Sequence, residues 1–281
     1  MLTQDTLKHF HMFRDPFVDD VRSAEDVFMT NEYRYVLASM RHAAQAQGIV
    51  AVVADSGAGK TTMRRMLMDE LRKDGKTTVI MPSIIDKTRV TAAGLCEAII
   101  ADISDENPKR SLEAKARQVE RLLRDASRSG QKHVMVIEEA HDLTIPTLRY
   151  LKRFWELEDG FTKLLGIVLI GQTELGLKLQ EHRNSQAREL IRRCITVDLR
   201  PLDDQLQNYL SYKLERVGTS LPKVIEPEAV EEIRRRLRRK DKGQVVSDLY
   251  PLVINNLVVK ALNAAAEFGD DRVTSEIIKH V

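Results

Sequence analysis

The order of apolar and polar positions predicts strands that alternate with helices through the first two thirds of the chain. Five short apolar runs have the length of buried strands, and they occupy residues 49–53, 77–81, 132–137, 164–170 and 194–199. Before the first run and between the later ones, apolar residues recur every three or four positions, as on a helix with one buried face. This spacing predicts helices at 31–47, 63–71, 90–103, 112–129 and 144–157. This alternation predicts an α/β fold, with a parallel sheet between helical layers.

The rest of the chain has a different pattern. Residues 202–281 contain no run typical of a strand, and helical spacing recurs at 203–217, 228–240 and 245–268. Residues 1–30 hold four of the seven phenylalanines, which is typical of an arm that packs on a neighbouring core. We therefore expect an N-terminal arm (1–30), an α/β domain (31–201) and a separate all-helical lid domain (202–281).

The loop after the first strand has the pattern of a phosphate-binding loop. It lies between the apolar run 49–53 and a helical pattern, and it ends in Lys-Thr. Successive backbone N–H groups of such a loop, with a helix N-terminus behind them, form a concave anion site. This context predicts nucleotide binding by residues Asp55, Ser56, Gly57, Ala58, Gly59, Lys60, Thr61 and Thr62.

Two side chains of this loop are expected to act on the nucleotide. Lys60 is placed to reach the β- and γ-phosphates, and the Thr61 hydroxyl to ligate Mg²⁺, so the expected ligands are ATP and Mg²⁺. One position departs from the consensus, because Ala54 stands where the first glycine belongs.

Two carboxylates follow the third predicted strand. Glu138 is expected to help hold Mg²⁺ through water, and Glu139 to act as the general base that polarises the attacking water. Glu138 replaces the more common aspartate, so its carboxylate stands one methylene further out. An acidic strand end by itself is usually only solvated, but its position about 80 residues after the phosphate-binding loop favours a hydrolytic site.

Further polar residues follow or precede the later strands. Gln172 comes directly after the fourth strand, where it is placed to orient water or the γ-phosphate. Arg188, Arg192 and Arg193 precede the fifth strand. For Arg188 we favour a solvated helix end, whereas Arg192 or Arg193 at the domain edge is placed to reach the nucleotide of a neighbouring subunit.

Two basic groups are candidates for contact with nucleic-acid backbone. Residues 234–242 include seven basic residues among nine, and at helical spacing their arginines face outward with no nearby acid. A loop group lies beyond the second strand. No aromatic residue interleaves with either group, which favours sequence-nonspecific contact with duplex DNA over base stacking. The candidate residues are Lys87, Arg89, Lys109, Arg110, Lys115, Arg235, Arg238 and Arg239.

Composition narrows the class of protein. The chain has 281 residues, of which 43% are hydrophobic and 31% charged, as in a globular protein with a real core. The net charge is only +2, so any nucleic-acid contact requires a local patch. We expect no membrane segment, no signal peptide and no disulfide framework, and the simplest location is the cytoplasm.

In their order, these motifs are similar to those of the AAA+ ATPases. The match consists of the loop 54–61, the acidic strand end 137–141, the segment 169–174 and the segment 193–202. The aromatic arm and the ending at residues 254–262 resemble the ExeA-like branch, which includes the transposition ATPase TnsC and is related in role to the Mu B protein and IstB. The resemblance implies a five-stranded sheet of order 5-1-4-3-2 with a helical lid.

The resemblance also implies how the protein works. ATP is expected at subunit interfaces with an arginine finger given in trans, for which Arg193 is the best match and Arg192 the second. Transposition members form ATP-dependent rings or helical filaments on duplex DNA, select target DNA and activate a transposase. That is the expected function here, with slow ATP hydrolysis because Ala54, Glu138 and Leu252 depart from the family pattern.

Two alternatives stay open at this point. One is a soluble ATPase that drives the assembly of an envelope or secretion complex. The other is a nucleotide-gated protein-interaction switch with little hydrolysis, which the departures at Glu138 and Leu252 favour.

Overall fold

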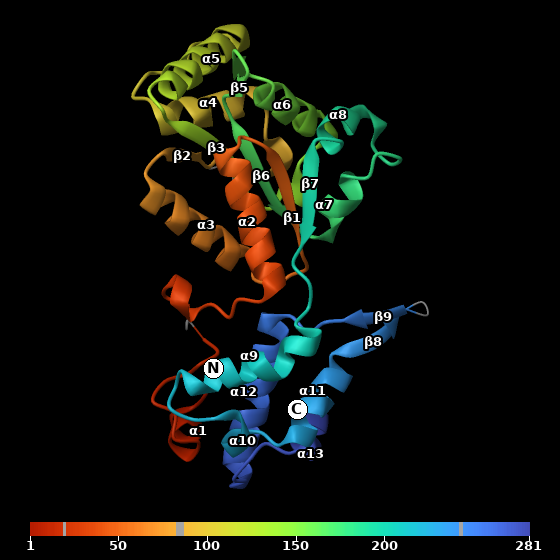
Figure 1. Ribbon diagram of the computed structural model, residues 1–281. Helices are drawn as coiled ribbons and strands as arrows, with labels where there is room; N and C mark the ends of the chain where they lie inside the picture. The colour runs from red at the N-terminus through yellow and green to blue at the C-terminus, as the bar shows by residue number, and fades with distance from the viewer. Residues whose placement is uncertain (19–20, 83–86, 242–243) are drawn as a thin grey trace. The chain divides into compact units, whose positions relative to one another are not determined.

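A computed structural model describes residues 1–18, 21–82, 87–241 and 244–281 (Figure 1). The chain divides into two compact units. The first consists of residues 31–56 and 60–199, and the second of residues 1–30, 57–59 and 200–281. None of the helices among the described residues has the length and apolar character of a membrane span.

The first unit is built on a five-stranded parallel sheet of order β2-β3-β6-β1-β7. Counted within the sheet, this order is 5-1-4-3-2, so the predicted fold is confirmed. Every residue of β1 is buried, as expected for a strand covered on both faces. The strands are β1 (Ile49–Val53), β2 (Thr77–Ile80), β3 (Lys132–Ile137), β6 (Gly166–Gly171) and β7 (Cys194–Asp198).

Helices cover both faces of this sheet (Figure 1). One face carries α2 (Asn31–Gln45) and α3 (Lys60–Asp74). The other carries α4 (Ala92–Ile103), α5 (Leu112–Arg128), α6 (Ile145–Trp155), α7 (Thr173–Lys178) and α8 (Arg188–Ile191). A short hairpin of β4 (Glu158–Asp159) and β5 (Thr162–Lys163) follows α6.

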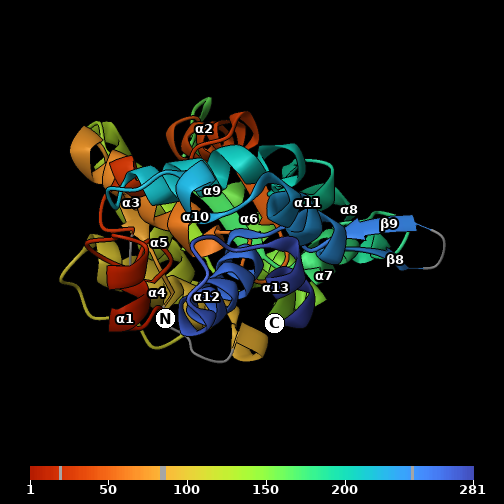
Figure 2. The ribbon, with the colours of Figure 1, turned by 90° about the horizontal axis from the view of Figure 1, so that it is seen from below.

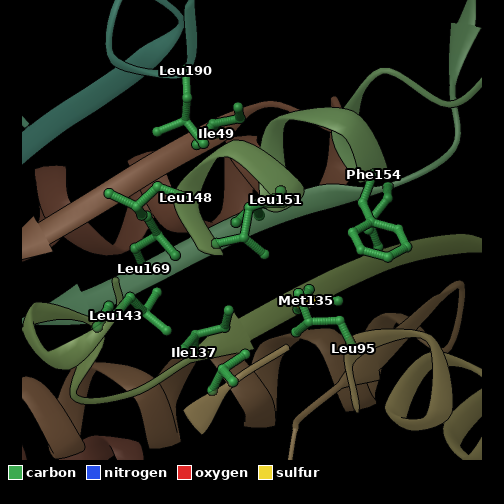
Figure 3. Close-up of a cluster of buried hydrophobic side chains, with 14 of the residues drawn as sticks. Ile49, Leu95, Met135, Ile137, Leu143, Leu148, Leu151, Phe154, Leu169 and Leu190 are labelled. Carbon is green, nitrogen blue, oxygen red and sulfur yellow. The ribbon is translucent and has the colours of Figure 1, made fainter. Parts of the chain in front are cut away.

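The core between the sheet and α6 follows from the strand period of two. Ile49 of β1 and Leu169 of β6 point toward the face where Leu148 and Leu151 of α6 lie (Figure 3). All four side chains are at most 2% exposed. Burying an aliphatic side chain of this size contributes about 1.5–3 kcal/mol, so this layer fixes α6 against the strands.

The second unit is mainly helical. Helix α13 packs against both α11 and α12 (Figure 2). The helices are α1 (Gln4–His9), α9 (Leu206–Glu215), α10 (Leu221–Val224), α11 (Pro227–Arg236), α12 (Pro251–Phe268) and α13 (Ser275–His280). The N-terminal arm belongs to this unit, and its Phe10 and Phe17 are buried as expected, whereas Phe13 is exposed.

The all-helical prediction for residues 202–281 was wrong in one place. Helix α11 ends at Arg236, and an antiparallel hairpin of β8 (Arg238–Asp241) and β9 (Gln244–Ser247) follows where helical patterns were expected. The Asp248 N–H donates to the Leu237 carbonyl at 2.7 Å, so a long-range bond takes the carbonyl on which a continued helix depends. Such tertiary pairing overrides local helix propensity. Lys242, the last of the seven basic residues, lies outside the described residues.

Candidate nucleotide-binding site

The predicted site residues of the first unit gather at the carboxyl edge of the sheet. Ala54 follows β1, Glu138 follows β3 and Gln172 follows β6. Parallel pairing places Val53 opposite Gly171 and Ile137 opposite Leu169, so these three strand ends lie side by side. This edge is where ligands bind in open α/β sheets.

The phosphate-binding loop has the backbone that its glycines permit. Gly57 and Gly59 have φ of +80° and +96°, which L-residues rarely adopt. Ala54 has no positive φ, its side chain is buried, and its N–H donates to the Gly171 carbonyl at 3.1 Å. Alanine in place of the consensus glycine therefore introduces no backbone strain at position 54.

Lys60 lies at the first position of α3 and folds over the loop. Its Nζ donates to the carbonyls of Ala54 and Asp55, both at 2.8 Å. Burial lowers the pKa of the Lys60 ammonium, and nearby carboxylates act in the opposite direction, those of Glu139, Asp55 and Glu174. The carboxylate of Glu139, the predicted base, is therefore close enough to the loop to act on the charge of Lys60.

The donor set for Mg²⁺ comprises a hydroxyl and a carboxylate. Thr61 is exposed at the second position of α3, and Glu138 is one third exposed. Hard oxygen donors with room for water suit Mg²⁺, which keeps part of its hydration shell. The residues therefore fit the metal. Glu138 is also engaged by a residue that sequence reasoning missed, because Arg64 Nε lies 2.9 Å from its Oε1.

Glu139 has an unusual backbone. Its φ of +51° is left-handed, a conformation that a non-glycine residue adopts only where the surroundings hold it. The side chain is 53% exposed, and its Oε2 lies 3.4 Å from His141 Nδ1. The same ring nitrogen lies 3.4 Å from the backbone N of Gln172. His141 was not among the predicted site residues. It lies between Glu139, the predicted base, and Gln172, which is predicted to orient water or the γ-phosphate.

The two candidate finger arginines have different surroundings. Arg192 pairs with Glu181 through two contacts of 2.8 and 2.9 Å. The Arg193 guanidinium lies over the ring of Trp155, with 5.2 Å from Cζ to the ring centroid. Both arginines precede β7, at the amino end of a strand, whereas the phosphate-binding loop lies at the carboxyl edge.

The basic group at residues 234–242 differs from its prediction. Arg238 and Arg239 lie on β8 rather than on a helix, and the expected absence of nearby acids was wrong. Each predicted member has a carboxylate partner: Arg235 pairs with Glu232, Arg238 with Asp203 and Arg239 with Asp248.

The loop group is divided between several elements. Lys87 and Arg89 lie on the short helix η2 (Lys87–Arg89), and Lys109 and Arg110 lie on the exposed segment between α4 and α5. Lys115 lies within α5 and pairs with Glu97 of α4. The structure therefore does not bring the five residues together on one element.

Spacing could have found Arg64, because it is one helical turn after Lys60 and so lies on the same side of α3. No local signal marks Trp155. Trp155 is distinguished only by its contacts in the folded chain, which are with Gln47, Lys163 and Arg193.

Comparisons with known proteins concern the domain type and the fold. Residues 41–179 match a family model described as an AAA domain. The chain is 27% identical over 251 residues to General secretion pathway protein A of Aeromonas hydrophila. The aligned region covers 88% of this chain and 42% of that protein. The chain thus spans about two fifths of the length of this curated relative. This relative is a secretion protein, which does not support the expected role in transposition.

Solved structures share the fold. Cdc6p from Pyrobaculum aerophilum has a TM-score of 0.61 at 15% identity, over 93% of this chain and 68% of that chain. The Aeropyrum pernix ORC1 protein, solved in complex with DNA, has a TM-score of 0.56 at 17% identity, over 94% of this chain and 67% of that chain. At such identity the likeness concerns the fold alone.

Proposed function

We propose that this chain, whose residues 41–179 match an AAA domain model, hydrolyses ATP and uses the nucleotide to control self-association within a larger complex. The AAA domain implies nucleotide binding. ATP with Mg²⁺ is the proposed ligand, at the loop of residues 54–62.

The position of Arg193 carries this proposal. β7 runs parallel to β1, with Cys194 opposite Ile49 and Asp198 opposite Val53. Arg193 therefore stands beside the start of β1, and the loop follows its end. Five residues at about 3.3 Å each separate the two by roughly 16 Å along the strand. An arginine at that end of the sheet is suited to the nucleotide of a second copy.

The chain's own residues supply the remaining chemistry. Lys60 neutralises charge on the terminal phosphates, and Glu139 accepts a hydrogen bond from the attacking water and receives its proton. Gln172 orients that water from the end of β6. Thr61 and Glu138 would hold Mg²⁺, which when bound offsets phosphate charge.

We propose a secretion-type envelope complex as the assembly on which this ATPase acts. The support is the relative, General secretion pathway protein A, to which 88% of the chain aligns. Since the chain spans 42% of that protein, the proposal concerns the ATPase part and its nucleotide-dependent assembly.

A second candidate is an ATPase that assembles on duplex DNA and activates a transposase. The observation that favours it is the exposed pair Lys109 and Arg110, whose side chains make no ion pair with any described residue. The carboxylate partners of Arg235, Arg238 and Arg239 weigh against the other group, because contact with phosphate requires these pairs to break.

Light scattering with ATP, a slowly hydrolysed analogue, ADP or no nucleotide tests the proposal. We expect larger particles with ATP or the analogue than with ADP, and no effect of duplex DNA. If duplex DNA is required, and Arg110→Gln weakens its effect while the matched change Arg72→Gln does not, the second candidate replaces the first. Particle size that is independent of nucleotide contradicts both.

A mixing experiment tests the role of Arg193 in trans. Arg193→Ala and Lys60→Ala chains are each expected to be nearly inactive. In a mixture, the intact loop of one chain meets the intact Arg193 of the other, so part of the turnover should return. A mixture as inactive as its components would exclude the assignment.

A further inference from the structure

A cavity of about 400 Å³ lies on the outer side of α6, away from the phosphate-binding loop in sequence and in the sheet. One wall is α6, and the other is the segment of η4 (Ser185–Ala187) and α8. Its lining includes Arg149, Lys152 and Arg153 from α6, and Arg188 and Glu189 from the other wall. A volume of this size is that of a small-molecule site.

The lining carries a large excess of positive charge, with four cationic side chains and one carboxylate. Lys152 is neutralised by two carboxylates, since its Nζ lies 2.5 Å from Glu189 Oε2 and 2.7 Å from Glu156 Oε1. The other three cations are arginines. Within the described part of the chain, Arg149 makes no side-chain ion pair or hydrogen bond, and Arg153 makes no ion pair.

Two of the arginines are held in place by contacts that leave donors available. The Arg153 guanidinium lies over the Tyr150 ring, with 5.7 Å from Cζ to the centroid, and Arg153 lines both this cavity and a neighbouring one that Tyr150 also lines. Arg188 Nε lies 3.0 Å from Glu181 Oε1, a carboxylate that Arg188 shares with Arg192. Stacking and sharing of this kind restrict the side chain while part of each five-donor fork stays unused.

The other lining groups suit an anion as well. The hydroxyl of Ser185 and the amide of Gln186 add neutral donors, while Ala187 and Leu190 form a buried apolar floor. Arginine forks bind phosphate through two parallel hydrogen bonds, which gives such contacts both strength and geometry. Three arginines from two walls can therefore hold more than one phosphate group.

We propose that this cavity, the α6–α8 cavity, binds a small anion with at least two phosphate groups, of which pyrophosphate is the simplest. A concave cavity encloses a compact anion from several sides, whereas a nucleic-acid backbone requires an extended strip of cations. The site does not depend on the proposed function, because none of its lining residues belongs to the phosphate-binding loop or its carboxylates.

Calorimetry with pyrophosphate tests the site, with the protein first saturated with ADP so that the phosphate-binding loop is occupied. We expect one pyrophosphate per chain, bound more weakly as salt rises. Arg149→Gln with Arg153→Gln should weaken binding by about tenfold or more, and the two Arg→Lys changes should weaken it less. The matched pair Arg72→Gln with Lys76→Gln removes two exposed charges elsewhere and should leave the affinity unchanged.

Equilibrium dialysis with labelled ADP separates the sources of the phosphates. Two ADP per chain, falling to one in the Arg149→Gln, Arg153→Gln variant, identifies a nucleotide as the bound anion and supports the site. The proposal is overturned if ADP-saturated protein holds only one ADP per chain and binds no pyrophosphate at low salt, or if the double variant binds the anion as well as the parent chain does. Displacement of pyrophosphate by equimolar duplex DNA or by polyglutamate would also overturn it, in favour of a macromolecular partner.

Discussion

Arg64 Nε lies 2.9 Å from Glu138 Oε1, and the two side chains are only 20% and 33% exposed. Arg64 is one turn beyond Lys60 on α3, and Glu138 follows β3, so the ion pair joins the phosphate-binding helix to the acidic strand end. The Mg²⁺ proposed to bind at Thr61 would share the Glu138 carboxylate with this guanidinium. We therefore expect this ion pair to influence how readily Glu138 binds the metal.

Replacing Arg64 should change the Mg²⁺ requirement. In Arg64→Gln we expect the half-saturating Mg²⁺ concentration to fall several-fold, because no cation competes for Glu138. A titration of a fluorescent ATP analogue with Mg²⁺ measures it. Arg65→Gln removes the adjacent, exposed arginine and should leave the titration unchanged. An increased Mg²⁺ requirement in Arg64→Gln alone would mean that Arg64 orients Glu138 for the metal.

Replacing Glu139 separates an ATPase from a switch. Glu139→Gln should lower turnover by about 10²–10⁴-fold, because the amide cannot accept the proton from water, while nucleotide binding persists. Phosphate release and nucleotide affinity measure the two effects. Glu113→Gln, an exposed change on α5, is the control. Turnover that is minimal in the parent chain and unaffected by Glu139→Gln would favour the nucleotide-gated switch.

Trp155 should act as a positioning residue for Arg193. Its ring lies under the Arg193 guanidinium, and its Nε1 donates to the Gln47 carbonyl at 2.7 Å. We expect Trp155→Ala to lower turnover about tenfold without affecting nucleotide binding, and Trp155→Phe to restore part of it because a ring face remains. Steady-state turnover and the nucleotide affinity are measured in parallel.

Two further variants test whether Trp155→Ala lowers turnover through Arg193 rather than by disturbing the fold. Lys163→Ala removes the other cation at the ring, with Nζ 4.8 Å from the centroid, and should leave turnover unchanged. Trp155→Ala added to Arg193→Ala should cause no further loss, because both changes act through one group. Fully additive losses would show that Trp155 acts elsewhere.

Gly166 should be intolerant of any side chain. A Cβ at this position would lie 2.4 Å from the Ala43 carbonyl oxygen, because α2 crosses β6 closely there. Gly166→Ala should lower the free energy of unfolding by about 1–3 kcal/mol, as overpacking does. Urea denaturation measures it. Gly176→Ala, in α7 with its nearest neighbour at 3.4 Å, is the matched change and should not destabilise.

Local patterns of residues were enough to predict several elements of the fold. The alternation of apolar runs with helical spacing predicted all five strands of the sheet, because buried parallel strands require continuous apolar runs. The strand, glycine-containing loop and Lys-Thr predicted a phosphate-binding loop, and in the structure its Gly57 and Gly59 adopt φ values that other residues rarely reach. Together these signals placed the carboxylates of Glu138 and Glu139 at the edge of the sheet that holds the loop.

The partners of the charged side chains depend on the fold and could not be predicted from local patterns. The arginines near the C-terminus have acidic partners such as Asp203 and Asp248, which are distant in sequence or fixed by the hairpin. Arg64 pairs with Glu138, and the Arg193 guanidinium lies over Trp155, because the packing of helices on the sheet brings these side chains together. A charge pattern states how many cations a segment carries, whereas the fold determines which of them stay available to a ligand.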